Sequence, residues 1–153
     1  MKIIFREDVI IIFLKKENIN NIDFNSKSVI EEYIKQLLTN LKRIINIDLY
    51  GLYTLNIFLD KYYGAVVEID KVDNDIYYLN DIIDMKINII ETEFLYEIDL
   101  LKIDKSKYDI YLYKDKIFLK IKKDLDNQEF MRLIENSNII YDDENIRFSS
   151  KKI

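Results

Sequence analysis

The sequence predicts an α+β fold with a mostly antiparallel sheet, covered on one face by a long amphipathic helix over about 28–45. A shorter C-terminal helix is expected over about 126–136. Two observations support this fold class: an apolar pattern of helical period in the first stretch, and segments of period two before and after it. In addition, the strand-like segments are grouped rather than alternating with helices, which favours antiparallel over parallel pairing.

The composition is that of a folded chain. Hydrophobic residues make up 49% and charged residues 33% of the 153 residues, and no Pro-, Gly- or Ser-rich linker interrupts them. A chain of this length is long enough to bury a sizeable core. We therefore expect one globular domain over residues 1–153. The alternative is a second small domain, which the length allows but does not require.

The first two strands are expected at Lys2–Phe5 and Val9–Leu14, on either side of a charged turn. The second of these segments is apolar at consecutive positions. Such a run is typical of a strand that is covered on both faces.

The stretch Ser28–Ile45 is the clearest helix, because its apolar residues recur every three or four positions and polar residues fill the other face. We expect Ser28 and Glu31 to form a capping box at its start. An apolar stripe of this size must be buried, either on strands of the same chain or, alternatively, on a helix of another chain. The residues of the stripe are Val29, Ile30, Tyr33, Ile34, Leu37, Leu38, Leu41, Ile44 and Ile45.

After this helix the pattern changes to period two, which predicts strands. Gly64 is expected to take a positive φ in the turn that follows Asp60. Asp126 is expected to cap the C-terminal helix, with Glu129 three residues on. The strands are predicted over 49–59, 65–69, 76–79, 85–90, 94–98, 108–113, 117–121, 138–141 and 146–148, and residues 149–153 are expected to be a frayed end.

The composition excludes several kinds of chemistry. With no His and no Cys, the chain cannot build a Ser-His-Asp or Cys-His arrangement, the usual zinc sites or an iron–sulfur cluster. Its two glycines form no phosphate-binding loop. We expect no cofactor.

Charge and location follow from the same composition. A net charge of −5 disfavours nonspecific binding of nucleic acid or of anionic membranes. The N-terminal residues lack the pattern of a signal peptide, and the apolar run Val9–Leu14 is too short to cross a bilayer. We expect a soluble, cytoplasmic protein.

Two tyrosine pairs suggest the leading function. Tyr62 with Tyr63, and Tyr77 with Tyr78, are adjacent residues of strand-like segments, so one ring of each pair can enter the core while the other meets solvent or a partner. Tyrosine is enriched at interfaces. The leading hypothesis is a non-enzymatic intracellular module that binds an unidentified protein, as an adaptor, regulator or inhibitory partner. It predicts that replacing Tyr62 and Tyr63 by alanine leaves thermal stability nearly unchanged.

Two alternatives come from other functional classes. Asp70, Asp73 and Asp75 offer the oxygen ligands that Mg²⁺ and Ca²⁺ prefer, which suggests a metal-dependent or carboxylate-based enzyme. The third hypothesis is a single-stranded nucleic-acid binder, in which aromatic rings stack on bases and lysines contact phosphates. Its residues are Tyr111, Tyr113, Lys114, Lys116, Phe118, Lys120 and Lys122.

Overall fold

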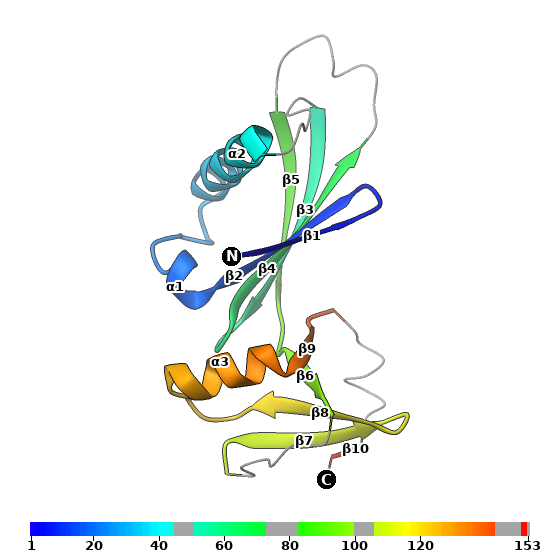
Figure 1. Ribbon diagram of the computed structural model, residues 1–153. Coiled ribbons are helices and arrows are strands. Elements are labelled where there is room, and N and C mark those ends of the chain that lie inside the picture. Colours follow the sequence, from blue (N-terminus) through cyan, green and yellow to red (C-terminus); the bar gives the residue numbers. More distant parts are fainter. Residues whose placement is uncertain (45–50, 73–82, 100–105, 143–150, 153) are drawn as a thin grey trace. The chain divides into compact units, whose positions relative to one another are not determined.

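The computed structural model confirms the α+β class, with two mostly antiparallel sheets, a long helix and a short C-terminal helix (Figure 1). The residues that it describes are 1–44, 51–72, 83–99, 106–142 and 151–152. The predicted strands over 76–79 and 146–148 lie outside these residues.

The chain divides into two compact units. The single domain expected over residues 1–153 stays a prediction. The first unit comprises Met1–Leu59 and Gly64–Ile90, and the second comprises Asp60–Tyr63 and Glu91–Ile153. The four residues Asp60–Tyr63 therefore belong to the second unit, although residues of the first unit precede and follow them in the chain.

The first unit contains a five-stranded sheet with the order β1-β2-β4-β3-β5. Both pairings of β2, with β1 and with β4, are antiparallel. The strands are β1 (Lys2–Arg6), β2 (Val9–Lys15), β3 (Gly51–Asp60), β4 (Gly64–Val72) and β5 (Ile83–Glu91).

The strand β2 lies inside this sheet, between β1 and β4. The four consecutive side chains Ile11 to Leu14 are all buried, with exposed fractions of 6% or less. Because successive strand residues point to opposite faces, both faces of β2 are covered. This confirms the prediction made from its continuous apolar run.

The long helix α2 (Lys27–Ile44) packs on one face of the first sheet (Figure 1). Ile30, Ile34 and Leu38 of its apolar stripe share one buried cluster with Leu55 of β3 and Val67 of β4. The stripe is therefore buried within the chain. A four-residue helix, α1 (Lys16–Ile19), follows β2 directly.

The start of α2 differs from the predicted capping box. The hydroxyl oxygen of Ser26 accepts a hydrogen bond from the backbone N–H of Val29 at 3.4 Å, and the backbone N–H of Ile30 donates to the carbonyl oxygen of Ser26 at 3.2 Å. Ser26 thus occupies the capping position that we assigned to Ser28. Both serines have the required hydroxyl, and the helix begins at the earlier of the two.

Gly64 opens β4 with φ of +130°, as predicted. A Cβ at this position would run into the carbonyl oxygen of Leu14 and the backbone N of Lys16. Only glycine therefore allows β4 to begin at this point directly beside the end of β2.

The second unit contains a second five-stranded sheet, with the order β10-β7-β8-β6-β9. All of its pairings are antiparallel. Since Lys151–Lys152 pairs with β7, this segment is not the frayed end that we expected. The strands are β6 (Leu95–Ile98), β7 (Tyr108–Tyr113), β8 (Lys116–Ile121), β9 (Ser137–Ile140) and β10 (Lys151–Lys152).

The predicted strands over 108–113 and 117–121 form a hairpin of β7 and β8, with Ile110 opposite Leu119 and Leu112 opposite Ile117. Its turn consists of Lys114 and Asp115, whose φ values are 47° and 62°. Two successive positive φ values are typical of the tight turn that matches the twist of paired strands.

The C-terminal helix α3 (Asn127–Glu135) begins as predicted. The Oδ1 of Asp126 accepts a hydrogen bond from the backbone N–H of Glu129 at 2.8 Å. This hydrogen bond, as the main cause, lowers the pKa of the Asp126 carboxyl group. The Nζ of Lys107 donates to the Oε1 of Glu129 at 2.6 Å, which ties the first turn of the helix to the segment before β7.

Within the part of the chain that the structure describes, no helix has the length and the apolar character needed to span a membrane.

Candidate functional site

The second unit contains a polar pocket of about 280 Å³. Its walls come from three stretches: the end of β3 with the turn after it, residues 92–96 at the start of β6, and the paired strands β7 and β8 with the residue after β8. The lining residues are Asp60, Lys61, Tyr62, Thr92, Glu93, Phe94, Tyr96, Asp109, Lys120, Ile121 and Lys122.

The carboxylate of Asp60 fixes one wall of this pocket. Its Oδ2 accepts hydrogen bonds from the backbone N–H groups of Tyr62 at 2.9 Å and Tyr63 at 2.8 Å. Its Oδ1 accepts a third from the backbone N–H of Phe94 at 2.9 Å. An aspartate often holds a turn by bonding to the backbone two or three residues on. Here it also ties the turn to the strand entry at Phe94.

Tyr63 anchors the same turn in the core of the second unit. Its side chain is 3% exposed, and its ring centroid lies 5.6 Å from that of Phe94 and 5.9 Å from that of Phe130 in α3. Burial raises the pKa of Tyr63 to about 12. The ring is therefore a packing element and is not part of the accessible surface.

Lys61 and Tyr62 remain at the rim of the pocket. Lys61 is exposed and Tyr62 is half-buried. The Nζ of Lys61 lies 5.3 Å from the centroid of the Tyr62 ring, within the range of a cation–π contact. The fixed turn thus presents a cation and an aromatic ring together.

Three other charged side chains of the lining, those of Glu93, Asp109 and Lys120, are paired. The Nζ of Lys120 lies 2.7 Å from the Oε2 of Glu93, and this hydrogen bond is the main cause of the raised pKa of Lys120. The Oδ1 of Asp109 lies 3.3 Å from the Nζ of Lys152. Both carboxylates therefore already have a cation beside them.

Two of the lining residues carry a hydroxyl group that has no hydrogen-bond partner among the described residues. These groups are the Oγ1 of Thr92 and the phenolic OH of Tyr96, and both atoms are buried. Burial, followed by the charge of Asp60, raises the pKa of Tyr96 well above its usual value. Tyr96 therefore keeps its proton at neutral pH.

The four tyrosines of the leading hypothesis have different positions. Tyr62 lines the pocket, whereas Tyr63 is buried and is not among the lining residues. Tyr77 and Tyr78 lie outside the described residues. Of the pair at 62 and 63, one ring enters the core and the other is accessible, which leaves Tyr62 to carry an interface role.

The aspartates of the metal hypothesis are described only in part. Asp70 is exposed on β4, opposite Val9 of β2, and Asp73 and Asp75 lie outside the described residues. Among the residues that the structure describes, no three Asp or Glu side chains are placed to hold a metal ion together.

The residues of the nucleic-acid hypothesis include a buried ring. Phe118 is 1% exposed and forms a small core with Leu95, against which Tyr111 and Tyr113 pack. Its ring face is therefore not available to stack on a base.

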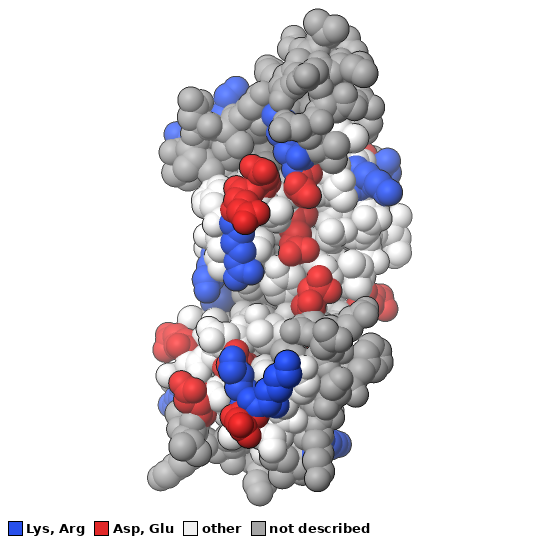
Figure 2. Space-filling view, turned by 90° about the vertical axis from the view of Figure 1, so that its right-hand side faces the viewer, with Lys and Arg blue, Asp and Glu red and all other residues white. Residues whose placement is uncertain are grey.

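The lysines of the same hypothesis are partly paired. The Nζ of Lys116 lies 3.2 Å from the Oε1 of Glu97, and Lys120 bonds to Glu93. Lys114 lies over the ring of Tyr113, with its Nζ 5.3 Å from the centroid. Figure 2 shows acidic side chains standing beside the basic ones on the face in view.

The pocket itself was not predicted from the sequence. The hydrogen bonds of Asp60 within its own turn could have been predicted, because an aspartate at the start of a turn often accepts from the backbone N–H groups of that turn. No local pattern pairs Asp60 with Phe94 or places Thr92 and Tyr96 in the same pocket. Those relationships depend on which strands become neighbours.

Comparison of the chain with protein-family models, with curated proteins and with solved structures found no match.

Proposed function

We propose that this protein is a non-enzymatic binding module that contacts another protein at the pocket of the second unit, with Lys61 and Tyr62 at the rim. The observation that carries the proposal is the fixed turn: the Asp60 carboxylate accepts from the backbone N–H groups of Tyr62, Tyr63 and Phe94. A site that is held in place before binding loses less conformational entropy on association.

The chemistry of the rim suits a protein partner. Tyr62 combines an apolar ring with a hydroxyl that tolerates water, and tyrosine is one of the residues that most often dominate binding energy. Lys61 beside it adds a charge that can select the partner. A half-buried ring next to a pocket is a common form of an interface anchor.

Carboxylate-based catalysis is the competing reading of the same pocket, because Asp60, Glu93 and Asp109 all line it. However, Asp60 is engaged by backbone N–H groups, Glu93 by Lys120 and Asp109 by Lys152. A general base must be free to take a proton from substrate. Because these carboxylates already form hydrogen bonds or ion pairs within the chain, the pocket favours binding over catalysis.

The proposal includes a cytoplasmic location, with which the cysteine-free sequence is compatible.

The test is a capture experiment with the tagged full chain and nuclease-treated lysate of the source organism, at two salt concentrations. The test variant carries Lys61→Ala and Tyr62→Ala. The control variant carries Lys114→Ala and Tyr113→Ala, which removes a second lysine–tyrosine pair with the same 5.3 Å separation from another turn of the second unit. Thermal melting confirms that each protein is folded.

The proposal expects one stoichiometric protein that binds the parent and the control variant and is lost from the test variant. Recovery of no such protein, or equal recovery by all three, would overturn it.

A further inference from the structure

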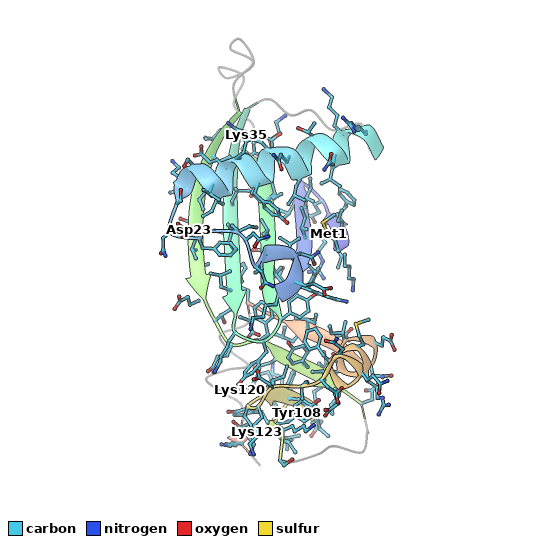
Figure 3. The ribbon with its side chains drawn as sticks, turned by 90° about the vertical axis from the view of Figure 1, so that its left-hand side faces the viewer. Met1, Asp23, Lys35, Tyr108, Lys120 and Lys123 are labelled. Carbon is cyan, nitrogen blue, oxygen red and sulfur yellow. The ribbon has the colours of Figure 1, made fainter. Side chains whose placement is uncertain are left out.

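The outer edge of β7 is covered only in part. β7 pairs with β8 along all six of its residues, but with β10 only at Tyr111 and Leu112. On this side, Asp109 and Ile110 have no strand partner among the residues that the structure describes. Tyr108, the first residue of β7, is labelled in Figure 3. An incompletely paired strand edge is a template for a further strand.

The segment that does pair there shows which chemistry the edge accepts. β10 places Lys152 opposite Tyr111, and the Nζ of Lys152 lies 3.3 Å from the Oδ1 of Asp109. The side chain of Asp109 is 19% exposed, whereas that of Lys152 is 60% exposed. A carboxylate that is largely removed from water needs a cation beside it. β10 supplies this cation although it pairs at only two residues.

The neighbouring charges explain why a cation is needed at this position. Asp109 stands opposite Lys120 of β8, and the Nζ of Lys120 already lies 2.7 Å from the Oε2 of Glu93. With Lys152 in place, these two carboxylates face two ammonium groups. Without it, Asp109 and Glu93 would share the ammonium group of Lys120. A segment that replaces β10 is therefore favoured when it brings its own Lys or Arg to the position opposite Tyr111.

The positions on either side of that cation belong to the other face of the sheet. Successive strand residues point to opposite faces, so residues opposite Leu112 and Ile110 lie on the face away from Asp109. Leu112 is 40% exposed and Ile110 is 8% exposed. Apolar side chains opposite these two residues would cover the exposed part of Leu112. The complementary segment therefore has a basic residue between two apolar ones.

We infer that the outer edge of β7 adds an extended segment of a partner protein, antiparallel to β7, whose Lys or Arg stands opposite Tyr111 and faces Asp109. β10 is then an occupant from within the chain, which the partner displaces. The inference goes beyond the proposed function because it assigns a second contact surface. Of the residues 109–112 that form this surface, only Asp109 also lines the pocket.

The test uses the full chain and a fluorescein-labelled peptide, Thr-Val-Lys-Val-Thr-Val with an amidated C-terminus. Its lysine falls opposite Tyr111 when the peptide pairs with all six residues of β7. The matched peptide has Glu in place of Lys. By fluorescence anisotropy, the lysine peptide is expected to bind saturably and the glutamate peptide about tenfold more weakly. No saturable binding, or equal binding of the two peptides, would overturn the inference.

Two variants of the full chain locate the contact of the peptide lysine. Asp109→Asn keeps the side-chain shape and is expected to reduce the preference for the lysine peptide to about twofold or less. Asp115→Asn, at a turn position with φ of 62° that Asn tolerates, is expected to keep the preference. Thermal melting confirms that both variants are folded. Equal effects of the two substitutions would indicate a general attraction to an acidic chain and overturn the inference.

A second pair of variants tests β10 as the competitor. Lys152→Glu places a carboxylate beside Asp109 and is expected to tighten binding of the lysine peptide about threefold or more, because β10 occupies less of the edge. Lys123→Glu makes the same change of charge outside the strands and is expected to alter the affinity by less than about twofold. Equal gains in the two variants would contradict the inference. A dimer of the Lys152→Glu variant that excludes the peptide would assign the edge to a second copy of the chain and overturn it.

Hydrogen exchange identifies the strand that the peptide joins. The saturating lysine peptide is expected to slow amide exchange in β7 and to leave β9, the strand at the opposite edge of the same sheet, unchanged. Slower exchange in β9 and not in β7 would overturn the inference.

The two proposals fail separately. If the lysine peptide binds β7 while the lysate yields no partner, the strand-addition edge stands and the function proposed for the pocket falls. If a partner binds through Lys61 and Tyr62 while neither peptide binds, that function stands and the strand-addition edge falls.

Discussion

Asp60 and Phe94 stand 34 residues apart in the chain, yet the Oδ1 of Asp60 accepts a hydrogen bond from the backbone N–H of Phe94 at 2.9 Å. The same carboxylate holds the backbone of its own turn through Tyr62 and Tyr63. One side chain thus links a local turn to a distant strand entry. Its removal is expected to loosen both.

Replacing Asp60 by alanine is expected to lower the free energy of unfolding by about 2–4 kcal/mol, because three backbone N–H groups lose a charged acceptor. Urea denaturation of the full chain measures this change. The matched control is Asp23→Ala, since the exposed Asp23 accepts from one backbone N–H, that of Asn25. The control is expected to change stability by less than about 0.5 kcal/mol. An equal decrease in the free energy of unfolding in the two variants would show that the three hydrogen bonds of Asp60 stabilise the fold no more than the one of Asp23.

Tyr62 and Tyr63 are expected to respond differently to alanine. Tyr63→Ala removes a buried ring from between Phe94 and Phe130 and is expected to cost about 3–5 kcal/mol. Tyr62→Ala removes a half-buried ring at the rim and is expected to cost about 1 kcal/mol or less. This replaces the expectation that the double variant keeps its stability. Thermal melting of both single variants, side by side, checks the difference, and similar losses would contradict the assignment of Tyr63 to the core.

The apolar stripe of α2 is expected to respond according to burial. Leu38→Ala leaves a cavity between the helix and the first sheet, because this side chain is 1% exposed, and is expected to cost about 2–5 kcal/mol. Val29→Ala, on the same helix with 40% exposure, is expected to cost less than about 0.5 kcal/mol. In Figure 3, α2 runs across the strands of this sheet. If the two variants unfold at the same urea concentration, α2 does not depend on this contact.

The cap of α3 is expected to depend on pH. Hydrogen bonding to the backbone N–H of Glu129 lowers the pKa of Asp126 below its ordinary 3.8, so the ionised form is favoured in the folded state. The stabilisation is therefore complete well above pH 3.8 and is lost as the pH falls through the lowered pKa.

The measurement is the melting temperature of the parent and of Asp126→Asn at pH 6 and at pH 3. At pH 6 the parent is expected to have a higher melting temperature than Asp126→Asn. At pH 3 the difference in melting temperature between the two proteins is expected to be smaller. Asp124→Asn, which alters an acidic residue that does not cap the helix, serves as the control. A difference of the same size at both pH values would argue against a role for the charge.

Local patterns predicted the local structure well. Asp126 lies three residues before Glu129, and this spacing alone predicted the start of α3. The start of α2 was harder to place, because Ser26 and Ser28 both carry a capping hydroxyl and differ only in which backbone N–H groups they reach. Helix ends with two candidate caps are ambiguous to within a residue or two.

The remaining features could not be predicted, because they depend on contacts between strands that are distant in the sequence. Period-two alternation accounts for the burial of Leu119 and Ile121 on one face of β8, but it gives no reason to bury Phe118, which we expected to stack on bases. The structure buries Phe118 as well, because Leu95 of β6 shares its face. The sequence of a single strand does not determine which strands become its neighbours in the sheet. The pocket was missed for the same reason, since Thr92, Asp109 and Lys120 meet only after β6, β7 and β8 have paired.

The placement of Asp60–Tyr63 in the second unit also orders events during translation. Phe94 is synthesised 34 residues after Asp60, which takes roughly 2–7 seconds at typical elongation rates. Phe130, the other neighbour of Tyr63, follows later still. During this interval the Asp60 carboxylate has its partners at Tyr62 and Tyr63 but lacks Phe94, and the ring of Tyr63 lacks both Phe94 and Phe130. The connection between β3 and β4 therefore reaches its final state only when the C-terminal half has emerged.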